Sequence, residues 1–329
     1  MSGPPRDAAI FVGGLPRSGT SLMRDILGSH PDVAMFFGEL PLWRELAAAH
    51  AGRSLARAAN RDALIRDLVT HPRMQRAQMT LDADALAAAL AREPAVSLGT
   101  VFAHALRQYA RREGKPRWGV KDPRNEFHAD QILAEFPAAR VVHMLRDPRD
   151  VIASQRAMWG SRAQHIVSTT HDWRRSAALA RHHQAVHRGS YAVVRYEDLV
   201  LDPARVVRDL CRTLDLDYRP AMLDLAANPR WSEGEGDDSR RAEPSRAISA
   251  GRVARHLRDL APGEATYVEW RARREMDDWG YARATPAARG GRVRIARCLA
   301  EEGAWRLLRS LQVWAPIARA LGRLPRERG

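Results

Sequence analysis

The chain has 329 residues, 45% of them hydrophobic, and a formal net charge of +14. A chain of this length and composition can bury one large core with a small appended subdomain, which excludes a disordered protein. No run approaches the roughly 18 apolar residues of a membrane span, and residues 1–9 lack the layout of a secretory signal, so we expect a cytoplasmic protein. Cys211 and Cys298 lie far apart in helix-like segments, which favours reduced apolar residues over a disulfide or a metal site.

The first predicted element is a buried strand over residues 8–13, followed by a loop of the phosphate-binding type and a helix that ends near Ser29. Residues 14–21 keep the length of the nucleotide P-loop, G-x-x-x-x-G-K-[ST], but Thr20 stands at the lysine position. That lysine reaches the β and γ phosphates of ATP. This loop can therefore hold a phosphate on backbone N–H groups but is poorly equipped for γ-phosphoryl transfer. Arg17 supplies a cation from inside the loop.

Three further β-rich runs cover residues 117–120, 140–145 and 191–195, and helical stretches separate them. Strands that alternate with helices predict an α/β fold with a parallel sheet and helices on both faces. Residues 42–93 are rich in Ala, Arg and Leu and have no strand signal. We expect them to form a helical insert that could cover a substrate cleft.

The C-terminal half is predicted to be mainly helical, with helices over residues 159–187, 203–214 and 252–279. Between the last two, residues 228–250 hold many Gly, Ser, Pro and charged residues and predict a long loop, which in a compact chain is usually functional or mobile.

The end of the chain carries much of the positive charge, because residues 283–329 hold eleven Arg against three Glu. We place a boundary between a main domain over residues 1–284 and a basic helical tail over residues 285–329. Trp305 and Trp314 fall at helical spacing in this tail. Such a helix can pack on its own domain, the reading that we favour, or make peripheral contact with an anionic membrane surface.

A second anion site is indicated where the strand over residues 140–145 ends on Arg146. A turn follows at Asp147, and a helix starts by Asp150 and leads to Ser154. Ligands of open parallel sheets bind at the carboxyl ends of the strands, so Arg146 is placed to meet a phosphate. The alternative is a turn-stabilising ion pair of Arg146 with Asp147 or Asp150.

The first loop and the segment LRDPRDVIAS, residues 145–154, together resemble the sulfotransferases that use 3′-phosphoadenosine 5′-phosphosulfate (PAPS). The resemblance extends from about residue 8 to residue 283. It implies a P-loop-like fold and PAPS as co-substrate, with no metal. In that family the first loop grips the 5′-phosphosulfate, and the later Arg and Ser hold the 3′-phosphate. The matching residues here are Arg17, Ser18, Gly19, Thr20 and Ser21, then Arg146 and Ser154.

Within that family the closest likeness is to the tyrosylprotein branch and its bacterial relatives, through residues 14–33, VKDPR at 120–124 and RYEDLVLDP at 195–203. The resemblance implies a catalytic role for the lysine of the K-D-P turn, a nucleotide contact for the tyrosine of the last segment, and a glutamate base about twenty residues past the loop arginine. A later small polar residue, a Gly and a cation complete the cofactor site. The corresponding residues are Lys121, Tyr196 and Glu39, then Ser249, Gly251 and Arg255, where arginine replaces the lysine of the family.

The expected chemistry explains these residue types. Sulfuryl transfer moves an SO₃ unit in line from a phosphate to a hydroxyl, and cations such as Arg17 and Lys121 stabilise the charge that develops, without a metal. Glu39 would take the proton of the acceptor. The competing interpretations are a surface pair of Lys121 with Asp122, a solvated loop acid at Glu39 and a packing role for Tyr196.

Two other functions are compatible with parts of the sequence. A P-loop kinase shares the opening strand, loop and helix, and a non-enzymatic membrane or nucleic-acid binder would use the basic charge. Against nucleic acid, the sequence has no zinc-finger, RNP or helix-turn-helix signal. His128, His143 and the pair at 182–183 have no ligand partners at metal spacing, which favours structural roles. The acceptor, whether peptide tyrosine, sugar, phenol or lipid head group, and the oligomeric state stay open.

Overall fold

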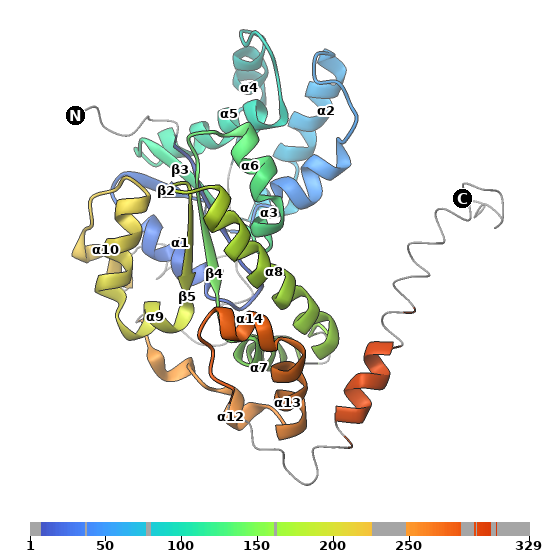
Figure 1. Ribbon diagram of the computed structural model, residues 1–329. Coiled ribbons are helices and arrows are strands. Elements are labelled where there is room, and N and C mark those ends of the chain that lie inside the picture. Colours follow the sequence, from blue (N-terminus) through green and yellow to red (C-terminus); the bar gives the residue numbers. More distant parts are fainter. Residues whose placement is uncertain are drawn as a thin grey trace, which may run out of the picture. The chain divides into compact units, whose positions relative to one another are not determined.

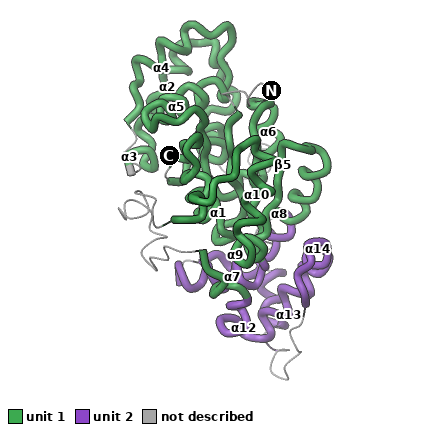
Figure 2. Tube along the Cα trace, turned by 90° about the vertical axis from the view of Figure 1, so that its left-hand side faces the viewer, with its two compact units in different colours: residues 1–146, 176–253 green, residues 147–175, 254–329 purple. Residues whose placement is uncertain are grey.

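The computed structural model describes residues 8–36, 38–76, 80–160, 163–225, 248–283, 293, 295–303 and 307. The chain divides into two compact units, one of residues 1–146 with 176–253 and the other of residues 147–175 with 254–329 (Figure 2). Most of the predicted loop over 228–250, and both Trp305 and Trp314, lie outside the described residues.

The first unit contains a parallel sheet in the order β2-β3-β1-β4-β5 (Figure 1). The strands are β1 (Ile10–Gly13), β2 (Val33–Met35), β3 (Arg117–Lys121), β4 (Arg140–Leu145) and β5 (Tyr191–Arg195). Four of them match the predicted strands. β2 was not predicted, because three residues directly after a helix and a His-Pro-Asp turn give no readable strand pattern.

Alternate side chains of the strands enter two separate hydrophobic cores. Phe11 and Val141 belong to one core, while Val12 and Val142 belong to the other. Successive side chains of a strand point to opposite faces of the sheet. When both faces are buried, the sequence of each strand is therefore a continuous apolar run. The predicted α/β class, with helices on both faces, is therefore confirmed.

The first unit holds most of the helices. α1 and α10 supply side chains to the core that contains Val12, whereas α5, α6 and the helices of the predicted insert pack in the core that contains Phe11. The elements are α1 (Thr20–Gly28), the π-helix η1 (Leu42–Ala47), α2 (Ala58–Val69), α3 (Pro72–Arg76), α4 (Ala83–Leu90), α5 (Leu98–Arg112), the 3₁₀ turn η2 (Asn125–His128), α6 (Ala129–Glu135), the C-terminal part of α8 (Ile166–Val186), α9 (Tyr196–Leu201), α10 (Pro203–Thr213), η4 (Pro220–Leu223) and η7 (Ala250–Arg252).

The second unit is helical. It comprises α7 (Pro148–Trp159), the start of α8, α12 (His256–Asp259), α13 (Pro262–Arg271), α14 (Arg273–Asp278) and helical residues 295–303. Cys298 is buried in its core beside Tyr267 and Val268. Glu302 accepts hydrogen bonds from Tyr267 and Arg271. The helical residues 295–303 therefore pack within the second unit.

Two predicted helices are interrupted. A continuous helix over residues 159–187 is wrong, because Gly160 adopts a positive φ of 54° and ends α7, and α8 begins only at Ile166. The predicted helix over 252–279 is split into α12, α13 and α14, with Pro262 opening α13. By contrast, α10 starts at Pro203 and extends to Thr213, close to the predicted bounds of 203–214.

Among the described residues, no helix has the length and apolarity needed to cross a bilayer. Both cysteines are buried thiols outside any disulfide, and burial raises the pKa of Cys211 to about 11. They act as apolar core residues, as the sequence predicts.

Lys115, one of only two lysines in the chain, ties the end of α1 to the start of β2. Its Nζ donates to the carbonyls of Gly28, His30 and Val33 at 2.8, 2.9 and 3.0 Å. An ammonium has three donors and no acceptor, so this cluster of carbonyls matches its full donor capacity. The contact connects the segment after α1 to the segment that leads into β3.

We expect Lys115→Met to lower the free energy of unfolding by about 2–3 kcal/mol, because charged hydrogen bonds are lost and carbonyls are left unpaired. Urea unfolding measures the change. Arg111→Met, at an exposed position on α5, is the matched control and should change stability by less than about 0.5 kcal/mol. Equal effects of the two substitutions would contradict this role of Lys115.

Candidate active site

The loop between β1 and α1 has the backbone shape of an anion cradle. Gly14, Arg17 and Gly19 adopt positive φ angles of 127°, 76° and 95°. A Cβ at Gly14 would lie 2.3 Å from the Met144 carbonyl oxygen, and one at Gly19 would lie 2.6 Å from a Tyr196 ring carbon. Only glycine allows such close approach, and the chain then enters α1 with its N–H groups at the helix N-terminus.

The K-D-P-R turn is hydrogen-bonded directly to this loop. Lys121 is the last residue of β3 and lies opposite Val12 in the parallel register. The Asp122 N–H donates to the Val12 carbonyl at 3.2 Å, and the Arg124 N–H donates to the Gly14 carbonyl at 3.0 Å. The carboxyl ends of β1 and β3 therefore bring the two sequence motifs together.

Glu39 lies between two cations from different parts of the chain. Lys121 Nζ donates to Glu39 Oε1 at 2.8 Å, and Arg73 Nη1 donates to Oε2 at 2.9 Å. The Lys121 side chain is 1% exposed, whereas that of Glu39 is 27% exposed. The interpretation of Lys121 as a surface partner of Asp122 is thus excluded, since Lys121 is buried and contacts Glu39. A reactant can approach the exposed side of the carboxylate.

Asp122 adds a second carboxyl to this cluster. Its Oδ1 lies 3.4 Å from Arg44 Nη2 of η1. Burial raises the pKa of Asp122 to about 6, against the opposing effect of the Arg44 charge. The first helices of the insert thus supply two arginines, Arg44 and Arg73, to the acids at the end of β3.

Arg146 joins the loop to two other segments. Its Nη1 donates to the Arg17 carbonyl at 3.2 Å and its Nη2 donates to the Arg252 carbonyl at 2.6 Å. The guanidinium carbon lies 4.2 Å from the centre of the Tyr196 ring, within the range of a cation–π contact. Tyr196 in turn covers Gly19. Residues predicted from three distant motifs are therefore in contact around the loop.

The remaining predicted cofactor residues fall into both units. Ser249 Oγ accepts from the Gly251 N–H at 3.1 Å, in the turn that presents the Arg252 carbonyl to Arg146. Ser154 and Arg255 belong to the second unit. There Ser154 is buried on α7, and Arg255 pairs with Asp259 at 2.6 Å.

A buried hydrogen-bond network holds the loop between β1 and α1 in place. Glu126 Oε2 accepts from the Gly14 N–H at 2.7 Å, and its Oε1 accepts from Ser176 Oγ at 3.0 Å. His143 contacts Ser176 through Nε2 at 2.9 Å and the Tyr191 hydroxyl through Nδ1 at 2.8 Å. Burial raises the pKa of Glu126 to about 7 and lowers that of His143 to about 3.

Glu126, Arg73 and Arg44 are functional candidates that were not predicted from the sequence. Glu126 could have been noticed two residues after the VKDPR segment, as an acid in an otherwise buried stretch. The two arginines carry no signal among so many others, because only the fold shows which ones face the acids. His143 is structural, as predicted, since both ring nitrogens have partners within the unit.

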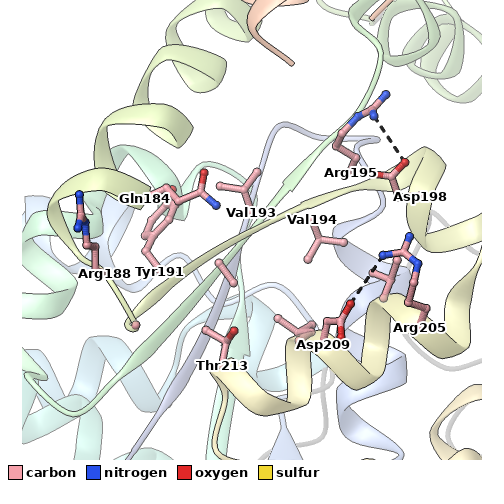
Figure 3. Close-up of a pocket in the computed structure, with 14 residues that line it drawn as sticks. Gln184, Arg188, Tyr191, Val193, Val194, Arg195, Asp198, Arg205, Asp209 and Thr213 are labelled. Carbon is pink, nitrogen blue, oxygen red and sulfur yellow. Dashed lines mark ion pairs between the residues drawn. The ribbon is translucent and has the colours of Figure 1, made fainter. Parts of the chain in front are cut away.

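A separate pocket of about 440 Å³ lies along β5, between the C-terminal end of α8 and the length of α10 (Figure 3). Two ion pairs border it, Arg195 with Asp198 at 3.5 Å and Arg205 with Asp209 at 3.7 Å. Its 14 lining residues include none of the predicted site residues. The pocket therefore does not coincide with the cluster around Glu39 and Arg146.

The fold and the loop define a P-loop-like α/β protein that lacks the P-loop lysine. Residues 9–220 match the model of the Sulfotransferase family, and the chain belongs to this family. It is 27% identical over 220 residues to the protein-tyrosine sulfotransferase of Drosophila melanogaster, with 65% of this chain and 39% of that protein covered. It is 31% identical over 157 residues to the nodulation protein NoeE of Sinorhizobium fredii, with 47% and 33% covered. The chain spans less than half the length of these two relatives.

Solved structures give the same fold. The sulfotransferase domain of the Synechococcus PCC 7002 olefin synthase superposes with a TM-score of 0.56 at 20% identity, covering 86% of this chain and 98% of that domain. The sulfotransferase domain from the curacin biosynthetic pathway gives 0.56 at 19% identity, covering 86% and 100%. The P-loop-like α/β fold predicted from the sequence is thus confirmed.

The raised pKa of Glu126 predicts a pH dependence of stability. Between pH 4.5 and about 7 the folded protein keeps a proton that the unfolded chain has lost, so the free energy of unfolding falls as the pH rises through this window. The contribution is fully present below pH 4.5 and amounts to about 3 kcal/mol. Glu126→Gln keeps an acceptor for Gly14 but cannot titrate. Urea unfolding at several pH values should give the variant a flatter profile than the wild type.

Asp62→Asn, at an exposed position on α2, is the control and should follow the wild-type profile. Parallel profiles of Glu126→Gln and the wild type would assign the pH dependence to other groups, such as Asp122.

Proposed function

We propose that this protein transfers a sulfuryl group from PAPS to a hydroxyl acceptor. The observation that carries the proposal is the 2.8 Å contact between Glu39 and Lys121 at the sheet edge that also holds the loop over residues 14–21. A carboxylate and a buried ammonium beside an anion cradle supply a proton acceptor and a cation for a charged transition state. Membership of the Sulfotransferase family supports the same reaction.

The residues around the loop suit the nucleotide end of PAPS. Backbone N–H groups from Gly19 to Ser21, at the start of α1, can receive the 5′-phosphosulfate, whereas the predicted Ser18 N–H donates to the Leu15 carbonyl at 3.1 Å. Arg17 adds a cation from within the loop, and next to it the buried Arg146 guanidinium lies over the buried Tyr196 ring. In this proposal Arg146 and Ser154 hold the 3′-phosphate, while Ser249, Gly251 and Arg255 line the cofactor.

The reaction is a single in-line displacement. The acceptor oxygen forms a bond to sulfur while the bond between sulfur and the bridging phosphate oxygen breaks, and the bond electrons stay on that oxygen. The proton of the acceptor passes to Glu39, and 3′,5′-adenosine bisphosphate leaves. Lys121 and Arg17 stabilise the negative charge on the bridging and equatorial oxygens. The exposed side of Glu39 admits the acceptor hydroxyl.

The helical insert over residues 42–93 is proposed to cover the acceptor cleft. Its support is the contact of Arg73, on α3 of the insert, with Glu39.

Two relatives, from Drosophila melanogaster and Danio rerio, have names that specify protein tyrosine. Peptide tyrosine is thus one of the acceptor classes to test, with sugars, phenols and lipid head groups. A screen of these classes with labelled PAPS identifies the acceptor, and ATP with Mg²⁺ as alternative donor tests the competing kinase.

We expect Arg17→Ala and Arg146→Ala each to weaken the affinity for 3′,5′-adenosine bisphosphate at least tenfold, about 1.4 kcal/mol. The Arg146 effect should shrink for a nucleotide that lacks the 3′-phosphate, because the lost charge then has no partner. Calorimetric titration measures both affinities, and Arg212→Ala, an exposed position on α10, is the control. Equal losses with both nucleotides would refute the 3′-phosphate assignment to Arg146.

Lys121→Ala and Glu39→Gln should lower turnover by about two orders of magnitude or more, the scale of losing a positioned acid–base or charge-stabilising group. Nucleotide affinity and the thermal transition should change little in Glu39→Gln. Labelled sulfate transfer in the presence of EDTA measures the rate. Near-wild-type turnover in Glu39→Gln would place the base elsewhere.

A further inference from the structure

Three potential metal ligands converge in the first unit, at the end of α8 and the start of α6 (Figure 1). The ligating atoms of Asp130, His183 and His187 all lie within 4.8 Å of one another. His187 Nε2 lies 2.8 Å from Asp130 Oδ1, and His183 Nδ1 lies 3.5 Å from the same oxygen. Two imidazoles and a carboxylate thus point toward a common centre.

The helix determines this arrangement. His183 and His187 are four residues apart, and the His187 N–H donates to the His183 carbonyl at 2.8 Å, so the helical turn continues past Val186. Residues at this spacing lie on one face of a helix, and paired histidines four apart are a common zinc-binding arrangement. Their rings stack with centroids 5.5 Å apart. Asp130, in the first turn of α6, completes the group.

His183 provides the independent observation that a ligand is needed. The residue is 2% exposed, and its Nδ1 is buried with no hydrogen-bond partner. This Nδ1 atom faces the Asp130 carboxylate at 3.5 Å, and the unprotonated nitrogen of a neutral imidazole is a metal ligand. A cation between the nitrogen and the carboxylate is a partner for both groups.

We propose that Asp130, His183 and His187 bind a divalent transition-metal ion of the Zn²⁺ class. Imidazole nitrogen and carboxylate oxygen are ligands that suit Zn²⁺. Tetrahedral coordination needs ligand atoms roughly 3.3 Å apart, so modest side-chain rotations complete the site. The Asp130 side chain is 70% exposed, which leaves the fourth position to water.

The ion is structural in this proposal. The His183 ring packs against Tyr191 with centroids 5.2 Å apart, and the Tyr191 hydroxyl bonds His143 in the network under the loop. Fixing His183 therefore fixes one end of the chain of contacts that leads through Ser176 and Glu126 to the loop. The ion takes no part in the sulfuryl transfer proposed above.

The full chain, purified without a histidine tag and stripped with EDTA, is titrated with Zn²⁺ against a chromophoric chelator and with Co²⁺ by absorption. We expect one equivalent to bind, with the visible bands of tetrahedral Co²⁺. His187→Ala, at a half-buried position, should weaken Zn²⁺ affinity at least tenfold, and Asp130→Asn should also weaken it. The neighbouring exposed His182→Ala is the matched control and should bind like the wild type.

Thermal unfolding supplies a second readout, because an ion that binds only the folded state raises the midpoint. Zn²⁺ should raise the midpoint of the wild type and of His182→Ala, and should leave that of His187→Ala unchanged. Equal Zn²⁺ affinity in the wild type and His187→Ala, or equal losses in His182→Ala and His187→Ala, would overturn the proposed site.

Discussion

The buried carboxylate of Glu126 connects the loop between β1 and α1 to the rest of the first unit. Its two oxygens accept from the Gly14 N–H and from Ser176 on α8. Burial of a charge without partners is costly, so the Glu126 carboxyl needs both donors. The two hydrogen bonds in turn hold Gly14 and Ser176 in position. The backbone at Gly14 can then follow its left-handed path against Met144 and lead into α1. Arg17, Lys121 and Arg146 depend on this loop position for their mutual placement.

The chain has only two lysines, Lys115 and Lys121, beside 51 arginines, and each lies at a site that suits lysine better than arginine. A lysine is a compact point charge with three donors, whereas the planar fork of arginine requires a wider site. The Lys115 ammonium donates to three carbonyls. The Lys121 ammonium contacts Glu39, and the Lys121 side chain is only 1% exposed. Arginine cannot reproduce either geometry without moving the backbone around it.

The sequence predicted the fold where local pattern and tertiary structure agree. Four strands were readable as apolar runs because both faces of the sheet are buried, but β2 was too short, and the break at Gly160 depended on one glycine with positive φ. The family resemblance suggested that Glu39 and Lys121 belong to one site, but their contact across 82 residues of sequence is seen only in the structure. Glu126 and the pair His183 and His187 had only weak signals, an acid in a buried stretch and two histidines four residues apart, and the sequence analysis gave the pair at 182–183 no ligand partner at metal spacing. Their significance comes from burial and from partners that only the folded chain brings close.

The two cations on Glu39 differ in what they can do. Arg73 is 36% exposed, so water screens its charge, whereas Lys121 is almost fully buried and interacts through a medium of lower dielectric. Lys121 therefore dominates the electrostatics of the carboxylate. In the proposed reaction the Lys121 ammonium turns from the Glu39 carboxylate toward charge that develops on the sulfuryl oxygens. Proton uptake by Glu39 and stabilisation of the leaving group by Lys121 would then occur together, because one contact is exchanged for the other.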